Sequence, residues 1–436
     1  MQNAVQVDGN EIRIAGTSVP LADLDRIVVV GGGKAGGHMA AGFETAVDGS
    51  PFEKLLSGWV NVPDDCIRPT KRIHLHPARP AGRNEPTYEG VVGSREILNQ
   101  VADLKDRDLC VVLISGGGSA LMPAPIPGIS LQEKLAITRM LSAAGANIHE
   151  LNTVRRQLSS IKGGGLKKAC KAGRLVTLVI SDVLGDPLDV IASGPTVASS
   201  TTPTDAIAVM KKFDRRGVQV NTMHILDMLV KYPNWPSKEP VTTDHPDTSF
   251  RICENHILAN NQTALEASAE AAKRLGYETL VMPMDVDEPT AEQVAIKLID
   301  QIKVSAAKRN SADPPLCILS GGEPTVRLAP EDSRGIGGRN QQLVLQALAE
   351  LANEDTMPPG SIGLLSGGSD GEDGPTDAAG AMIWPDLIHA ARQSRLAMQH
   401  HLGTNDAWHF LGPPGALLRT GPTGTNVCDV RVMIVA

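Results

Sequence analysis

The stretch at residues 27–37, IVVVGGGKAGG, constrains the fold of this chain more than any other. Its four leading residues, an isoleucine and three valines, predict a strand that is buried on both faces. Glycines 31–33 then turn the chain, Lys34 stands inside the turn, and residues 38–44 predict the opening of a helix. A strand, a glycine turn and a helix in this order direct backbone N–H groups toward an anion such as phosphate. A lysine in the turn is suited to stabilise a transferred phosphoryl group, so we predict that Lys34 is catalytic.

Length and composition indicate a two-domain α/β protein. A chain of 436 residues is too long for one hydrophobic core, and its 43 glycines and 30 prolines favour many short loops. The net charge of −8 argues against nucleic acid or an anionic membrane as a partner. The six cysteines are too far apart for a redox or zinc motif, so Cys110 and Cys317 are expected in the core. Since no apolar run spans a membrane and no secretion signal follows Met1, the expected location is the cytoplasm.

Strand and helix patterns alternate along the whole chain, which predicts two layered α/β domains with mainly parallel sheets. A small hairpin is expected within residues 5–20, and a surface loop containing His74 and His76 at 68–86. Buried strands are expected at 27–30, 109–114 and 174–180, and further strands at 278–282, 316–319, 363–365 and 429–435. Helices are expected after the capping boxes at 130–133, 263–266 and 290–293, and at 339–352.

The polar, proline-rich stretch 232–250 is the predicted linker. We therefore place a Rossmann-like N-terminal domain with a mainly parallel sheet at residues 1–235. A C-terminal α/β domain follows at residues 250–436.

Three of the predicted strands run directly into Ser-Gly-Gly, at Ser115, Ser320 and Ser366. Ligands of open α/β sheets collect at the carboxyl ends of the strands, so these loops are expected to offer hydroxyl and N–H groups to a ligand. The residues predicted to bind substrate or nucleotide here and in the Lys34 turn are Gly32, Gly33, Ser115, Gly116, Gly117, Gly118, Ser119, Ser320, Gly321, Gly322 and Glu323.

Two acidic stretches are candidates for metal binding and proton transfer. Asp182 and Asp186 follow a buried strand, where such a pair suits Mg²⁺ or a general base and equally suits the cap of a following helix. We predict that Asp182 is catalytic and that Asp186 binds metal. Asp370 and Asp373 belong to the densest acidic cluster of the chain, for which we predict a role in holding Mg²⁺ or a nucleotide ribose.

Arg339 enters the predicted helix 339–352 directly after two glycines. Its planar guanidinium suits bidentate capture of a carboxylate or a phosphate, and a surface salt bridge is the alternative. Arg339 is a predicted catalytic residue, and Asn340 beside it a predicted binding residue.

The glycines at 31, 33 and 36 also satisfy the GxGxxG pattern of dinucleotide sites, with Asp64 or Asp65 as the ribose ligand. These acids come later than usual, and a lysine in the turn is unusual for close approach to a pyrophosphate. No GxxxxGK[ST] motif is present, which excludes a P-loop ATPase.

Eight motifs between Val28 and Val435 together resemble the class II glycerate kinases, whose C-terminal part is the MOFRL domain. They are GGGKAGG, SGGGSAL, LNTVRRQLSSIKGGGL, ISDVLGDPLDVIASGPT, LSGGEPTV, GGRNQQL, SGGSDGEDGPTDAAGA and GPTGTNVCDVRV. The resemblance implies ATP-dependent phosphorylation of D-glycerate, giving 2-phosphoglycerate and ADP, with Mg²⁺. It also implies an active site in the cleft between the two domains, with the MOFRL region at about residues 314–432.

The lysine and arginine essential in that family fall on Lys34 and Arg339. Replacing either by alanine is expected to lower turnover by orders of magnitude and leave the fold intact. The implied partners are D-glycerate and ATP. The sequence is compatible with a homo-oligomer. The alternatives are an NAD(P)H-dependent hydroxypyruvate reductase, based on GxGxxG, and a non-catalytic sugar-acid sensor.

Overall fold

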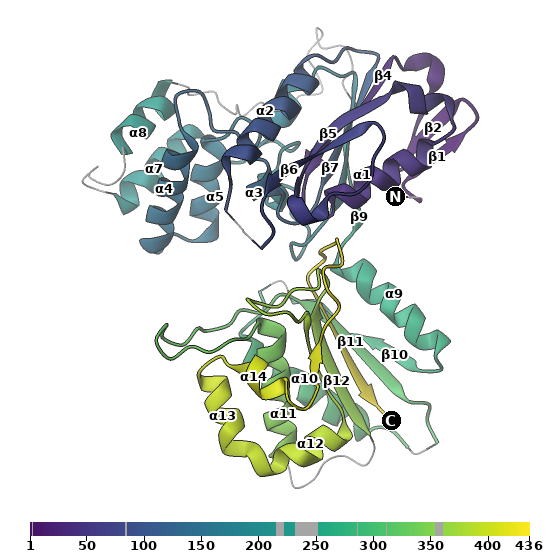
Figure 1. The fold of residues 1–436 in the computed structure, drawn as a ribbon, viewed down its shortest axis with the longest axis vertical. Helices are drawn as coiled ribbons and strands as arrows, with labels where there is room; N and C mark the ends of the chain where they lie inside the picture. The colour runs from purple at the N-terminus through teal and green to yellow at the C-terminus, as the bar shows by residue number, and fades with distance from the viewer. Residues whose placement is uncertain are drawn as a thin grey trace. The chain divides into compact units, whose positions relative to one another are not determined.

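The computed structural model describes residues 1, 3–82, 85–214, 222–231, 252–285, 287–310, 312–353 and 361–436. The chain forms two compact units (Figure 1): Met1–Ser181 with Asp186–Leu258, and Asp182–Gly185 with Ala259–Ala436. The predicted linker 232–250 lies outside the described residues. Two short segments lie across the expected domain boundaries, since 252–258 belongs to the first unit and 182–185 to the second.

The first unit is built on a six-stranded sheet in the order β6-β5-β4-β7-β8-β9. Its strands are β4 (Arg26–Gly32), β5 (Leu56–Pro63), β6 (Ile73–Arg79), β7 (Asp108–Ile114), β8 (Arg174–Ile180) and β9 (Ile252–Ala259). The pairs β6–β5, β5–β4, β4–β7 and β7–β8 are all parallel. The strand order is that of doubly wound dinucleotide-binding sheets, and it reverses between β4 and β7. A crevice for ligands is expected outside the carboxyl ends of these two strands.

The strands predicted in this unit are confirmed, and they are buried because helices cover the sheet. Every residue of β7 is buried, Cys110 included, and so is β4 from Ile27 to Gly32. The helices are α1 (Gly36–Val47), α2 (Tyr88–Ala102), α3 (Gly118–Leu121), α4 (Leu131–Ala143), α5 (Ile148–Gln157), α6 (Gly165–Ala169), α7 (Pro203–Phe213) and α8 (Thr222–Lys231). Helices α4, α5, α7 and α8 pack on one another around an apolar cluster of their own (Figure 1).

Two sequence-based expectations for this unit are wrong. The expected hairpin is a three-stranded antiparallel sheet, β1 (Val5–Asp8), β2 (Glu11–Ile14) and β3 (Thr17–Pro20). The expected surface loop with two histidines contains strand β6, in which Ile73 and Leu75 pack into the core and His76 is 9% exposed. Pro77 obscured this strand, but β6 is the edge strand of the sheet, where a missing N–H is tolerated.

The second unit also has a six-stranded sheet, in the order β10-β11-β15-β12-β13-β14. Its strands are β10 (Glu278–Val281), β11 (Leu316–Gly322), β12 (Ile362–Gly368), β13 (Gly380–Ile383), β14 (Leu417–Leu418) and β15 (Asp429–Val435). Only β10 and β11 are paired in parallel among these described strands, because the last strand, β15, inserts antiparallel between β11 and β12. The expectation of a mainly parallel sheet therefore fails for this unit, which has a mixed sheet.

The helices of the second unit are α9 (Asn261–Arg274), α10 (Ala291–Ala306), α11 (Arg339–Ala352), α12 (Pro385–Ala391), α13 (Arg395–Gly403) and α14 (Ala407–Leu411). Helix α11 begins and ends at the predicted residues and lies in the core of the unit. The capping boxes at Ser130 and Thr290 are confirmed, whereas α9 is capped by Asn260, whose side chain accepts the N–H of Thr263. Within the described residues, none of the helices combines the length and the apolar character needed to cross a membrane.

Candidate functional site

The Lys34 turn of the first unit lies at the reversal of strand order. Gly31 has φ of 146°, and a Cβ there would lie 2.0 Å from the carbonyl oxygen of Leu113 on the neighbouring strand β7. A side chain is therefore excluded at this position, which explains the glycine. The turn leads into α1, whose N-terminus has no side-chain cap and carries two further glycines. The backbone thus places the half-buried Lys34 at the carboxyl end of β4.

The loop after β7 is hydrogen-bonded to the Lys34 turn. The N–H of Lys34 donates to the carbonyl oxygen of Gly116 at 2.8 Å, and the N–H of Ala35 donates to Ser115 Oγ at 3.0 Å. These bonds use two of the N–H groups expected to face a phosphate. The predicted residues Gly32, Gly33 and Ser115 to Ser119 are nevertheless gathered at one place in the fold, the predicted crevice between β4 and β7.

Two cationic side chains flank Gly117 in this loop. Gly117 has φ of 77° and precedes α3. A Cβ at Gly117 would lie 3.4 Å from Arg79 Nη2 and 3.6 Å from Lys34 Cγ. Arg79, at the end of β6, is 4% exposed and was not predicted as a site residue. Arg79 could not be predicted from the sequence, because no local motif marks it and β6 lies three strands from β7 in the sheet.

Ser119, one residue into α3, meets a second set of polar groups that sequence reasoning also missed. Lys162 Nζ donates to the carbonyl oxygen of Ser119 at 2.8 Å, and Arg155 Nη2 donates to Ser119 Oγ at 3.3 Å. Ser193 Oγ lies 3.1 Å from Ser119 Oγ. The glycine run directly after Lys162 is the one local signal that could have drawn attention to this lysine.

In the second unit, Arg339 is held by two carboxylates. Its Nε and Nη2 donate to the two oxygens of Asp429 at 2.7 and 2.9 Å, and its Nη1 donates to Glu323 Oε1 at 2.9 Å. The Asp429 side chain is completely buried, while that of Arg339 is 30% exposed. Burial lowers the pKa of the guanidinium, but the hydrogen bonds and charge of Asp429 outweigh this and raise it. Arg339 therefore stays protonated. Asp429 was not predicted, because a single acid opening a strand is unremarkable in the sequence.

The glycines after Ser320 make room for side chains of the same unit. Strand β15 pairs with β11 as far as Gly322, so Ser320–Gly322 is strand and not the expected loop. A Cβ at Gly321 would lie 1.7 Å from Asn261 Oδ1, and one at Gly322 would lie 2.2 Å from Glu288 Oε2. The expected phosphate cradle at Ser320 is therefore filled by packing, and the third motif at Ser366 is likewise part of β12.

Asp373 serves as the cap of helix α11. Its carboxylate accepts the N–H groups of Asn340 at 3.0 Å and Gln341 at 2.9 Å, and the side-chain amide of Asn340 at 3.3 Å. Burial raises the pKa of Asp373 to about 6, although the N–H donors oppose this shift. With both oxygens engaged and the side chain buried, Asp373 is better explained as a helix cap than as the predicted metal ligand. Asn340 is also internal, since its Oδ1 accepts the hydroxyl of Ser366 at 2.5 Å.

A group of carboxylates surrounds the exposed side of Arg339. Partial burial raises the pKa of Glu323, the charge of Arg339 opposes the shift, and the negative charges of Asp429 and Asp182 add to it. Asp182 belongs to the second unit, where its carbonyl oxygen accepts a hydrogen bond from Cys428 Sγ at 3.0 Å. The predicted residues Asp182, Glu323 and Arg339 thus lie together with Asp429.

These carboxylates have the oxygen chemistry that Mg²⁺ prefers, and a cation beside Glu323 would offset the negative charges of Asp429 and Asp182. The other predicted metal ligands are divided, Asp186 in the first unit and Asp370 in the second. Across the described ranges, no three His, Cys, Asp or Glu side chains are already grouped to hold a metal.

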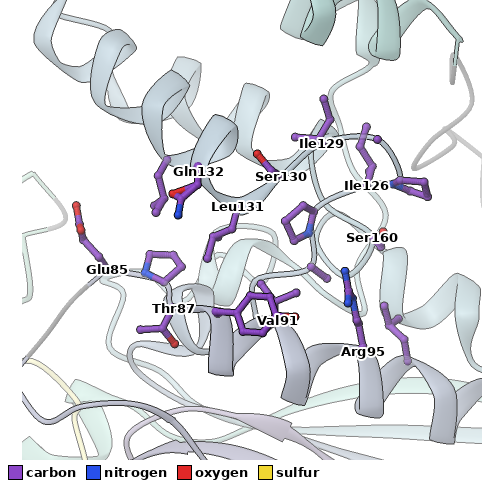
Figure 2. Close-up of a pocket in the computed structure, with 18 of the residues that line it drawn as sticks. Glu85, Thr87, Val91, Arg95, Ile126, Ile129, Ser130, Leu131, Gln132 and Ser160 are labelled. Atoms are coloured by element: carbon purple, nitrogen blue, oxygen red, sulfur yellow. The ribbon is translucent and has the colours of Figure 1, made fainter. Parts of the chain in front are cut away.

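A pocket of about 860 Å³ lies elsewhere in the first unit, between α2 and the segment that leads into α4. Figure 2 shows Thr87, Val91 and Arg95 on one side and Ile129, Ser130 and Leu131 on the other. Its lining includes none of the predicted site residues. The cationic groups of the Lys34 turn are therefore separate from this pocket.

Comparison with known proteins gives matches over the whole chain. The family model described as "Domain of unknown function (DUF4147)" matches residues 1–227, and the MOFRL family model matches residues 316–429. A glycerate kinase of Danio rerio is 34% identical, covering 100% of this chain and 93% of that protein. A D-glycerate 2-kinase of Thermotoga maritima is 32% identical, covering 96% of this chain and 93% of that protein. A solved structure of a Pyrococcus horikoshii protein matches with a TM-score of 0.78 at 31% identity, covering 100% of this chain and 93% of that one.

Proposed function

We propose, because this chain belongs to the glycerate kinase family with DUF4147 and MOFRL regions, that it transfers the terminal phosphoryl group of ATP to D-glycerate. The acceptor is the 2-hydroxyl, and the products are 2-phosphoglycerate and ADP. The observation that carries the proposal is the lysine turn at the carboxyl end of β4, hydrogen-bonded to the Ser115 loop where the strand order reverses. A cation at this position meets the main requirement of phosphoryl transfer, which is electrostatic stabilisation of the transferring group.

In the proposed reaction, the 2-hydroxyl oxygen of glycerate forms a bond to the γ-phosphorus of ATP. The bond from that phosphorus to the bridging oxygen breaks, and ADP leaves with the electron pair. Lys34 and Arg339 stabilise the negative charge on the phosphoryl oxygens during transfer. Three of the five N–H groups of Arg339 are held by Asp429 and Glu323, and the remaining two can donate to a phosphoryl oxygen.

Asp182 accepts the proton that the hydroxyl loses. Glu323, whose second carboxylate oxygen is free of Arg339, would hold Mg²⁺ together with phosphate oxygens of ATP. The bound cation would neutralise negative charge on the phosphates. Burial is the main cause of the raised pKa of Glu323, and the charges of Asp429 and Asp182 add to it. These neighbouring negative charges support the assignment, because they would attract a cation.

The test is phosphorus NMR of the product formed from ATP, Mg²⁺ and D-glycerate. We expect 2-phosphoglycerate and ADP in equal amounts, and a loss of turnover by at least about 100-fold in Lys34→Met, since one charged donor to the transition state is removed. Steady oxidation of NADH by hydroxypyruvate without ATP would instead establish the reductase. Binding of D-glycerate with no ADP formed, unaffected by Lys34→Met, would establish the sensor.

A further inference from the structure

Four side chains from separate segments of the first unit converge next to the Lys34 turn. They are Ser119 of α3, Arg155 of α5, Lys162 in the turn before α6, and Ser193 at the end of the 3-10 turn η4 (Ile191–Ser193). We call them the Ser119 cluster. Lys162 Nζ donates to the carbonyl oxygen of Ser119 at 2.8 Å, contacts Ser119 Oγ, and lies 3.4 Å from Ser193 Oγ. Arg155 Nη2 lies 3.3 Å from Ser119 Oγ.

The cluster gathers buried basic groups, and among the described residues no carboxylate forms a salt bridge with Lys162 or Arg155. Lys162 is 2% exposed. Burial lowers the pKa of Lys162 well below its usual value, and the charges of Arg155, Lys134 and Arg156, all positive, lower it further. The carboxylate of Asp189 is engaged elsewhere, with Arg156 at 3.1 Å.

Lys134 of α4 adds to this excess. It is 6% exposed, and its Nζ has no hydrogen-bond partner among the described residues. Buried cations are costly unless they are paired, so a fold that keeps Lys134, Arg155 and Lys162 together is suited to an anion that arrives from outside.

The backbone is strained at the same place. Ala192, Ser193 and Gly194 have positive φ values of 49°, 64° and 63°. Only glycine adopts this conformation without cost, and in it Ser193 Oγ lies 3.1 Å from Ser119 Oγ. Such strain persists where the surrounding structure enforces it, most often at ligand sites.

We infer that the Ser119 cluster binds the carboxylate of the three-carbon substrate acid. Arg155, Lys162 and the two serine hydroxyls offer charged and neutral donors from several directions, as a carboxylate requires. Ser119 Oγ accepts from both Lys162 and Arg155, so its own hydrogen is left to donate to Ser193 or to the ligand. Ser119 and Arg155 are partly exposed, which gives a ligand access from solvent.

The short distance to the Lys34 turn favours the substrate carboxylate over a nucleotide phosphate. Gly117, which Lys34 flanks, precedes Ser119 by two residues, or roughly 3 Å of helical rise. A three-carbon acid with its carboxylate at Ser119 is therefore close enough for its hydroxyl groups to reach the Lys34 turn. Arg339, the other candidate for this carboxylate, already holds the carboxylates of Asp429 and Glu323. The inference rests on the proposed function, and it makes the Ser119 cluster the part of the protein that selects an acid over an uncharged polyol.

The test compares Lys162→Met with the exposed control Lys167→Met in the full chain. We expect Lys162→Met to raise the KM for D-glycerate by about 10- to 100-fold, the effect of losing one charged hydrogen bond, with the KM for ATP changed by less than about threefold. Lys167→Met should leave both constants unchanged. The melting temperature of Lys162→Met should be equal to or above that of the wild type, because a buried charge is replaced by an apolar chain of similar length.

Binding measured without ATP separates this inference from the proposed kinase function. We expect D-glycerate and L-lactate, each added alone, to raise the melting temperature of the wild type, and glycerol to have no effect. Lys162→Met should abolish the response to both acids, whether or not the protein proves to be a kinase.

An unchanged KM for D-glycerate in an active Lys162→Met enzyme would overturn the inference and leave the kinase function standing. A response to inorganic phosphate in place of D-glycerate, lost together with ATP affinity in Lys162→Met, would overturn it in favour of a nucleotide phosphate. If Lys162→Met does not fold, Ser193→Ala decides, with an expected rise in the KM for D-glycerate of about 5- to 10-fold.

Discussion

The pair formed by Arg339 and Asp429 allows the stabilising role of the arginine to be separated from its catalytic role. Asp429 is completely buried, and both of its oxygens accept hydrogen bonds from Arg339, at 2.7 and 2.9 Å. Removing one partner of a buried ion pair costs about 3–5 kcal/mol, because the other charge is left buried and unpaired. The Arg339 side chain is 30% exposed, so water partly compensates and we expect about 3 kcal/mol for Arg339→Met.

The double variant Arg339→Met with Asp429→Asn should recover most of this loss, since no uncompensated charge remains. The assay is urea unfolding followed by the fluorescence of Trp384 and Trp408, which lie in the second unit, with Arg327→Met as the exposed control. Turnover should stay at least about 100-fold below the wild type in both the single and the double variant, because neither carries the guanidinium.

Two results would refute this reasoning. A loss below about 1 kcal/mol in Arg339→Met would show that Asp429 does not depend on the arginine for its stability in the core. Restored turnover in the double variant would show that Arg339 serves only to neutralise Asp429. The structure revises the expectation from the sequence that Arg339 can be replaced with the fold intact, because the replacement leaves Asp429 buried and unpaired.

Three further predictions concern the glycine turn, the buried lysine and the carboxylates. Gly31→Ala should lower stability by more than about 3 kcal/mol in urea unfolding, because the new Cβ would lie 2.0 Å from a backbone carbonyl of β7. In Gly363→Ala the new Cβ would lie 3.5 Å from the carbonyl oxygen of Ile383, an ordinary contact, so the loss should be less than about 1 kcal/mol. Equal losses in the two variants would contradict the packing argument. Burial lowers the pKa of Lys134 from 10.5 to about 7, so the unfolded chain binds more protons and stability rises with pH between these values. Lys134→Met should therefore raise the melting temperature most at pH 6.5 and least at pH 9.5, and a gain independent of pH would exclude this cause. Chelation by EDTA should stop phosphoryl transfer and added Mg²⁺ should restore it. Asp182→Asn should lower turnover by at least about 100-fold and Asp186→Asn by less than about threefold; the reverse order would exchange their roles.

The local patterns of the sequence predicted most helices and strands, but they did not predict which strands pair with one another. The valine run before Gly31 and the alternation in β15 identify strands because burial on a sheet demands such residues whatever the fold. The insertion of β15 between β11 and β12 could not be read from the chain, since pairing between strands distant in sequence leaves no local periodicity. The same insertion makes Ser320–Gly322 part of a strand, so a motif that suggests a loop proved to be a packing position.

The candidate site divides in the same way. Lys34 and Arg339 could be selected from the sequence because each stands in a glycine turn at the start of a helix, a context that is visible in a few consecutive residues. Two of the residues that surround them, Arg79 and Asp429, have no such local context. The glycine run after Lys162 marks this lysine, but only the folded chain brings it to Ser119 and Ser193. The sequence alone determined the strand–turn–helix units and the residue types at their tips, because these depend on short-range sterics and burial. The tertiary structure decided which charges meet and which of them are already paired, because electrostatic pairing depends on distances between segments that lie far apart in the chain.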